Sequence, residues 1–140
     1  MAKQPLYPRI SEHDEQSNLI HYVQVQYQSQ ENYAQALLFA VPNDFILGGE
    51  NKFAIPILAK HRKEGFRNGV ADLLYLKPRG NFAYLAMETK AIDKRDDPRA
   101  ISPDQQIFLD AVNASGGTGH ICYGCDELTA VFDWYMSLPV

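Results

Sequence analysis

Residues 70–90 read VADLLYLKPRGNFAYLAMETK, two apolar runs separated by PRGN, a sequence typical of a tight turn. The pattern predicts two antiparallel strands, at about 70–77 and 82–91. Because side chains alternate between the two faces of a strand, Glu88 and Lys90 share one face at the end of the second strand. With the turn near residues 78–81, Asp72 falls opposite about residue 87, next to Glu88. The hairpin therefore places two carboxylates and an amine at one end of a sheet.

The segments before and after this hairpin contain helical periodicity and capping residues. Ser11 and Ser102 precede helical stripes as N-caps, and Pro103 follows at the first helical position. We expect helices at about 12–28, 54–65, 103–115 and 126–137, and further strands at about 36–42 and 119–124. A strand, a helix and a strand in succession at 82–124 require parallel pairing, whereas the hairpin is antiparallel. The fold class is therefore α/β, with a central mixed β-sheet flanked by helices.

Length and composition indicate one globular domain. A chain of 140 residues can form a hydrophobic core without disulfides or bound metals to stabilise it, so we expect a single domain over 11–140. A flexible arm with two prolines is expected at 1–10. No apolar run approaches the length of a membrane helix, and the N-terminus has no secretion signal. The net charge of -4 differs from that of a generally basic nucleic-acid binder. These features favour a cytoplasmic protein with no membrane partner and no organic cofactor.

The two cysteines, Cys122 and Cys125, form a single C-x-x-C sequence. One such pair does not complete a four-cysteine zinc site, although His120 and His61 are conceivable additional ligands. The simpler interpretation is a pair of reduced cysteines beside a turn, which fits a reducing compartment.

The densest basic cluster is KHRKEGFR at 60–67. Its cations are Lys60, Arg62, Lys63 and Arg67. The cluster has two interpretations: a solvated helix end, or a surface that contacts DNA phosphates just before the Asp72 strand. Asn43, after Pro42, is a further candidate for the same cleft.

Neighbouring carboxylates repel each other unless a cation lies between them. Oxygen ligands suit Mg2+ or Mn2+, which acidify bound water and shield charge on a phosphodiester. Lys90 would then hold or deprotonate the attacking water, or neutralise developing charge. The spacing alone also fits an ordinary salt bridge at a strand end.

Three motifs in order carry a more specific signal: GVADL at 69–73, ETK at 88–90 and SPDQ at 102–105, followed by a helix and glycines. Together they resemble the VRR-NUC family of the PD-(D/E)xK nuclease superfamily, of the stand-alone phage or bacterial type. The resemblance extends over about residues 11–136 and implies a restriction-endonuclease-like core. Two positions depart from the family pattern. Ala71 stands where proline is usual, and Thr89 stands where Leu or Val is common.

The resemblance implies a role for each matching residue. Asp72, Glu88 and the Thr89 backbone carbonyl would bind Mg2+ or Mn2+, Lys90 would be the catalytic lysine, and Gln105 would lie near the metal or the DNA backbone. The first helix would add a further residue. Gln16 matches the family position best, Glu12 shares its inward face, and adjacent Glu15 is a third candidate.

The expected function is metal-dependent endonuclease activity. Members of this size resemble structure-specific nucleases that act on branched DNA such as Holliday junctions or flaps, often as homodimers, in DNA repair, recombination or phage replication. The resemblance thus implies DNA as the partner and a bacterial or phage-infected cell as the setting. The alternative is a DNA-binding protein on a nuclease scaffold with weak or no catalysis.

Overall fold

The computed structural model describes residues 10–28, 36–42 and 54–140, with side chains from residue 59 onward in the last range. The elements in chain order are α1 (Glu12–Gln26), β1 (Leu38–Ala40), α4 (Ala54–Lys63), β2 (Leu73–Tyr75), β3 (Leu85–Lys90), the short 3-10 helix η1 (Ile92–Lys94), α5 (Pro103–Ala114), β4 (Thr118–Tyr123) and α6 (Cys125–Ser137). This order is the predicted one, with η1 added where the sequence suggests a charged loop. The expected arm at 1–10 lies outside the described residues except for Ile10.

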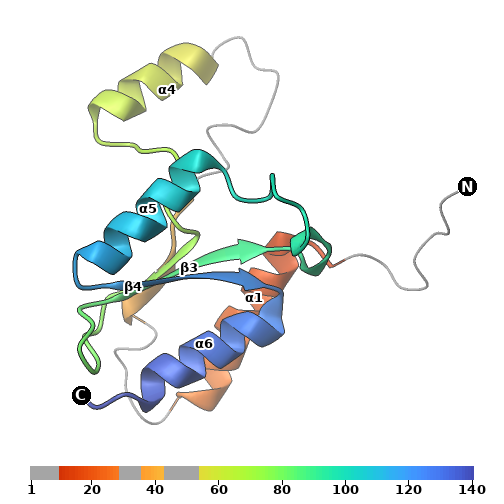
Figure 1. Cartoon of the computed structure of the whole chain (residues 1–140), viewed down its shortest axis with the longest axis vertical. Coiled ribbons are helices and arrows are strands. Elements are labelled where there is room, and N and C mark those ends of the chain that lie inside the picture. The colour runs from red at the N-terminus through yellow and green to blue at the C-terminus, as the bar shows by residue number, and fades with distance from the viewer. Residues whose placement is uncertain (1–9, 29–35, 43–53) are drawn as a thin grey trace, which may run out of the picture.

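The four strands of the described part form one mixed sheet in the order β1-β2-β3-β4 (Figure 1). β1 pairs with β2 and β2 with β3 in antiparallel fashion, whereas β3 and β4 are parallel. The crossover between β3 and β4 contains α5. The predicted mixed α/β sheet is therefore confirmed.

The hairpin register differs by one residue from the expected one. Leu73 pairs with Met87, which brings Asp72 opposite Glu88 itself rather than opposite residue 87. The difference originates at the turn, where Arg79 and Phe82 form an isolated bridge and exchange backbone hydrogen bonds of 3.0 Å. Past the turn, Ala83 donates to Gly116 and Tyr84 accepts from Thr118, so this segment bonds toward β4. β2 and β3 are consequently shorter than predicted.

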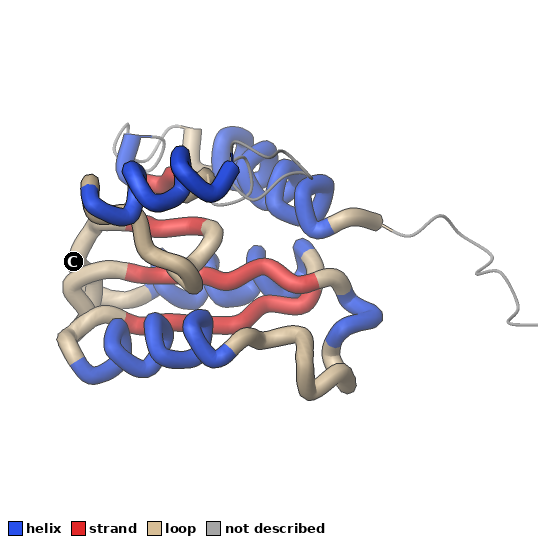
Figure 2. The backbone as a smooth tube through the Cα atoms, turned by 90° about the horizontal axis from the view of Figure 1, so that it is seen from above, coloured by secondary structure: helices blue, strands red, loops and turns tan. Residues whose placement is uncertain are grey.

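Helices cover both faces of the sheet, α5 on one face and α1 with α6 on the other (Figures 1 and 2). The main core lies between the sheet and the α1–α6 pair. Its buried residues are Leu19, Val23, Leu38, Leu73, Tyr75, Leu85, Met87, Cys122, Leu128, Phe132 and Tyr135. A smaller cluster of Ala71, Ala86 and Val112 packs under α5. β3 has a strand on each side and a helical layer on each face, so all six of its residues are buried.

Two tyrosines of the α1 segment form hydrogen bonds with α6. The hydroxyls of Tyr22 and Tyr27 donate to opposite carboxylate oxygens of Asp133, at 2.7 and 2.6 Å. Both bonds are charge-assisted and join residues more than a hundred positions apart. The two bonds hold the C-terminal part of α1 against α6. None of the helices in the described part is long and apolar enough to cross a membrane.

Candidate active site

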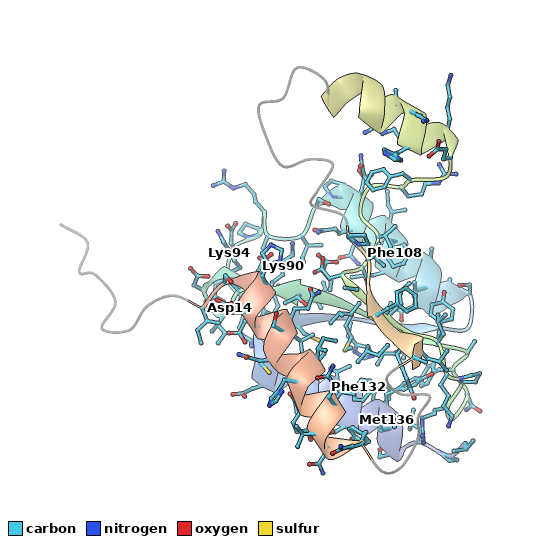
Figure 3. All side chains as sticks on the ribbon, turned by 180° about the vertical axis from the view of Figure 1, so that it is seen from behind. Asp14, Lys90, Lys94, Phe108, Phe132 and Met136 are labelled. Atoms are coloured by element: carbon cyan, nitrogen blue, oxygen red, sulfur yellow. The ribbon has the colours of Figure 1, made fainter. Side chains whose placement is uncertain are left out.

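The buried strand β3 ends in two charged residues. Glu88 is 2% exposed and Lys90 is 9% exposed, although burial of charged side chains is costly unless they are paired. Lys90 Nζ lies 3.6 Å from Glu88 Oε1, so the two side chains of one strand face form an ion pair. Figure 3 shows Lys90 near the start of α1 and near η1, where several elements meet.

Gln105, in the first turn of α5, joins the pair. Its Nε2 donates to Glu88 Oε1 at 2.8 Å, and its Oε1 accepts from Lys90 Nζ at 3.3 Å. The same Oε1 accepts from the backbone N–H of Ser102 at 2.9 Å, while Ser102 Oγ accepts from the Gln105 N–H. This reciprocal capping box fixes the Gln105 side chain at the helix start. The SPDQ motif therefore starts the helix and orients an amide toward Glu88 and Lys90.

Asp72 lies across the sheet from Glu88, in the position that the observed register gives it. Its Oδ2 accepts from the backbone N–H of Thr89 at 2.8 Å. The bond ties the start of β2 to the end of β3, so both carboxylates approach one place. The structure thus brings together Asp72, Glu88, Lys90 and Gln105.

The three candidates in the first helix have different surroundings. Glu12 Oε1 accepts from the backbone N–H of Ala91 at 3.4 Å, directly after Lys90, and burial together with the charge of Glu12 raises the pKa of Asp72. Glu15 is buried and accepts from the backbone N–H of Cys125, at the start of α6. Gln16 is half-buried on the same helix. Glu12 therefore reaches the site, Glu15 holds α6, and a role for Gln16 stays a prediction.

The electrostatics of the two acids favour a bound proton or cation. Burial, together with the negative charge of Asp72, raises the pKa of Glu88 to about 8, and Lys90 opposes this rise. Burial also raises the pKa of Asp72, against the Thr89 hydrogen bond and the charge of Lys90. At neutral pH the pair therefore resists carrying two negative charges.

One oxygen of the site lacks a hydrogen-bond donor. Glu88 Oε2 is buried, and among the described residues nothing donates to it. Buried carboxylate oxygens without a partner are uncommon and often mark the position of an ion or a water. Within the same described ranges, no three His, Cys, Asp or Glu side chains gather closely enough to hold a metal. The donor set thus consists of two carboxylates, leaving room for backbone and water oxygens.

The basic cluster lies in the last turn of α4 and in the loop that follows it. Lys60, Arg62, Lys63 and Arg67 are all exposed. Arg62 and Arg67 line an open hollow of about 290 Å³ together with Phe66, Asn68 and Asp104. Asp104 immediately precedes Gln105, so the cluster borders the site. The predicted contact at Asn43 lies outside the described residues.

Sequence reasoning missed three residues of this hollow: Phe66, Asn68 and Asp104. The first two belong to FRNG, which the sequence indicates only as a turn. Asp104 is part of SPDQ, where the motif draws attention to the glutamine. The available signal is their position: Phe66 lies within the basic cluster, Asn68 directly before GVADL, and Asp104 within SPDQ.

The candidate zinc ligands are engaged elsewhere. Cys122 is buried in the core, which raises its pKa to about 12, and Cys125 Sγ lies 3.7 Å from Thr129 Oγ1. His120 Nε2 is 2.8 Å from Thr118 Oγ1, and its ring packs in a T-shaped arrangement with that of Trp134, with 5.4 Å between centroids. His61 pairs with Glu64 on α4 at 3.3 Å. These contacts account for the four side chains as packing and surface residues.

Comparisons with known proteins bear on the fold. No family model matches the chain. Two curated relatives match part of it: nonribosomal peptide synthetase ungA' of Aspergillus campestris, 37% identical over 78 residues, and nonribosomal peptide synthetase ungA of Aspergillus violaceofuscus, 38% identical over 71 residues. The matches cover 52% and 47% of this chain but only 1% of each synthetase. The shared segment is a small piece of those very long proteins.

A solved structure matches nearly the whole chain. It is described as a VRR_NUC domain protein and superimposes with a TM-score of 0.72, covering 95% of this chain and 93% of that one, at 18% sequence identity. The chain therefore has the VRR-NUC fold, a restriction-endonuclease-like α/β core.

Proposed function

We propose that the protein is a metal-dependent DNA endonuclease. The observation that carries the proposal is the convergence of Asp72, Glu88, Lys90 and Gln105 at the end of β3, with Glu88 Oε2 buried and without a donor from the described residues. A purely structural ion pair would not require a second carboxylate beside it, nor a buried carboxylate oxygen to which no described residue donates.

The donor set fits Mg2+ or Mn2+, because these ions take oxygen ligands and keep several waters. Asp72, Glu88 and the Thr89 carbonyl would hold the ion, with Glu12 adding negative charge from α1. When bound, the ion would acidify a water and shield charge on the scissile phosphate. Such an ion would also offset the repulsion between Asp72 and Glu88 that, after burial, raises the pKa of Glu88.

Lys90 supplies the positive charge that the chain itself contributes. Its ammonium would donate to the attacking water or to a phosphate oxygen and stabilise the charge that develops there. Gln105 holds both Lys90 and Glu88, so it keeps the amine and the carboxylate at a fixed separation. Lys60, Arg62, Lys63 and Arg67 would contact the DNA backbone, and salt would weaken that attraction.

The finer expectations are part of the same proposal. The substrate would be branched DNA, such as a flap or a Holliday junction, cut by a homodimer during DNA repair, recombination or phage replication. A dimer carries two sites and so permits paired cuts. The setting would be the cytoplasm of a bacterial or phage-infected cell.

The test measures cleavage of labelled linear, flap and four-way-junction DNA with Mg2+, with Mn2+ or with a chelator. We expect metal-dependent cutting that Lys90→Ala and Asp72→Asn reduce by at least about a hundredfold, in line with removal of a group that stabilises the transition state. Gln105→Ala should also slow cutting, because Glu88 and Lys90 lose their common partner.

The matched control is Gln106→Ala. Gln106 is the neighbour of Gln105 on α5, is exposed, and its side chain bonds along the helix to Asp110 at 2.8 Å. This variant should cut DNA like the wild type. Absence of cleavage on every substrate would favour the alternative of a DNA-binding protein without catalysis. Equal cleavage by Lys90→Ala and the wild type would show that the cutting does not depend on this site.

A further inference from the structure

The hollow beside the basic cluster contains more than cations. It is lined by Arg62, Phe66, Arg67, Asn68 and Asp104, residues that carry two guanidinium groups, an aromatic ring, an amide and a carboxylate. Phe66 is half-buried, and the other four are exposed. A surface that only attracted phosphates would gain nothing from a carboxylate, because like charges repel.

These side chains together match the parts of a nucleotide. Aromatic rings stack on unpaired bases, arginines bind phosphates, and amide and carboxylate groups hydrogen-bond to base edges. The open hollow has a volume of about 290 Å³, close to the smallest small-ligand pockets, which suits one nucleotide.

The hollow is joined to the candidate active site through Gly69. A Cβ at this position would lie 2.7 Å from the Gln105 backbone nitrogen, so only glycine lets the loop approach the start of α5 this closely. The loop after α4 therefore packs on the helix turn that carries both Asp104 and Gln105 (Figure 1). A nucleotide in the hollow would lie one residue away from the group that holds Glu88 and Lys90.

We propose that this hollow binds a single unpaired base of the DNA strand and so makes the protein prefer DNA with an unpaired nucleotide beside the cleavage site. The inference rests on the proposed DNA substrate. Phe66 stacks on the base, Arg62 and Arg67 hold the adjoining phosphates, and Asp104 accepts from an exocyclic amino group. Cytosine, adenine and guanine carry such a group and thymine does not, so Asp104 disfavours thymine.

The test is equilibrium binding of the full chain to fluorescently labelled DNA in the presence of a chelator, which separates binding from cleavage. The probes are a blunt duplex and the same duplex with a short single-stranded overhang of cytosines or of thymines. We expect the cytosine overhang to bind more tightly than the thymine overhang, and the blunt duplex to bind most weakly. Phe66→Leu should weaken overhang binding by at least about fivefold, the loss of one stacked base, and leave blunt-duplex binding unchanged.

Asp104→Asn tests the predicted base preference and not only the affinity. An amide donates to the O4 of thymine, so the variant should bind the thymine overhang as tightly as the cytosine overhang or more tightly. Matched controls are Asp110→Asn, an exposed acid on the same helix, and Phe39→Leu, an exposed aromatic on β1. Both should keep the wild-type preference.

Several results would overturn the inference. Equal binding of blunt and overhang DNA by the wild type would do so, as would equal losses on all probes in Phe66→Leu. Free deoxycytidine monophosphate binding as tightly as the overhang would assign the hollow to a small molecule instead. Selective overhang binding without any metal-dependent cutting would support the hollow as a site for an unpaired base and would reject only the nuclease proposal.

Discussion

Glu88 is the residue in which burial and charge conflict most directly. It lies in a core strand with 2% of its surface exposed, beside a second acid, and its pKa is raised to about 8. Below its ordinary pKa of 4.5 the carboxyl is protonated in both the folded and the unfolded state, and its burial carries no charge penalty. As the pH rises toward 8, the unfolded state ionises freely while the folded state resists, so the folded state loses stability.

Glu88→Gln should therefore stabilise the metal-free protein, and the gain should grow with pH. We expect similar melting temperatures for variant and wild type near pH 4.5, and a higher one for the variant near pH 8, measured with a chelator present. Met87→Leu, a volume-conserving change of the adjacent buried residue, is the control, because it alters packing but no charge. A Glu88→Gln difference that stays constant over this range would contradict the assigned cause.

Part of the site could be predicted from residues alone. Strand alternation places Glu88 and Lys90 on one face, and the hairpin brings Asp72 close, because both are local geometry. The choice among Glu12, Glu15 and Gln16 could not be predicted in the same way. The three share one helix face by their spacing, and their roles are separated by contacts distant in sequence, of Glu12 with the Ala91 N–H and of Glu15 with the start of α6.

At the scale of elements, the loop between α4 and β2 packs closely against the start of α5. Gly69 has φ +83, and a Cβ added to it would collide with backbone atoms of Asp104 and Gln105. Gly65, four residues earlier, has φ +105, and a Cβ added there would have nothing within 4 Å. Both glycines have a positive φ, which favours glycine over other residues. Of these two, only Gly69 also lies close to the backbone of another element.

This contrast yields a paired prediction. Gly65→Ala should cost only the strain of a left-handed conformation, about 1–2 kcal/mol. Gly69→Ala should cost more, and it should also slow DNA cleavage because it displaces the turn that carries Gln105. Denaturant unfolding and cleavage rates of both variants test this. Equal losses of stability in the two variants would show that the close approach to α5 contributes nothing.

Element boundaries show where sequence patterns lose accuracy. The caps at Ser11 and Ser102 predict the helix starts correctly, because side-chain oxygens at those positions accept from backbone N–H groups nearby. The hairpin register expected from the turn is wrong by one residue. The segment 83–84 bonds toward β4, a partner distant in sequence that turn chemistry does not reveal.

At the scale of the whole molecule, the order of elements and the mixed sheet were predictable because apolar periodicity and turn residues are strong throughout 70–137. The layering also involves contacts that the sequence does not mark, such as the bonds from Tyr22 and Tyr27 to Asp133. These join the helix that carries Glu12 to the last helix, so the position of Glu12 depends on both ends of the chain.

The contact between His120 and Trp134 has a practical consequence. Trp134 is the only tryptophan in the chain, and a protonated imidazole quenches indole fluorescence at close range. Burial lowers the pKa of His120 below 6.5, so emission should fall only on acidification past that value, and His120→Gln should abolish the fall. Absence of quenching in the wild type would contradict this ring contact. The chain thus contains its own optical reporter, with which the folding of every variant can be followed without a label.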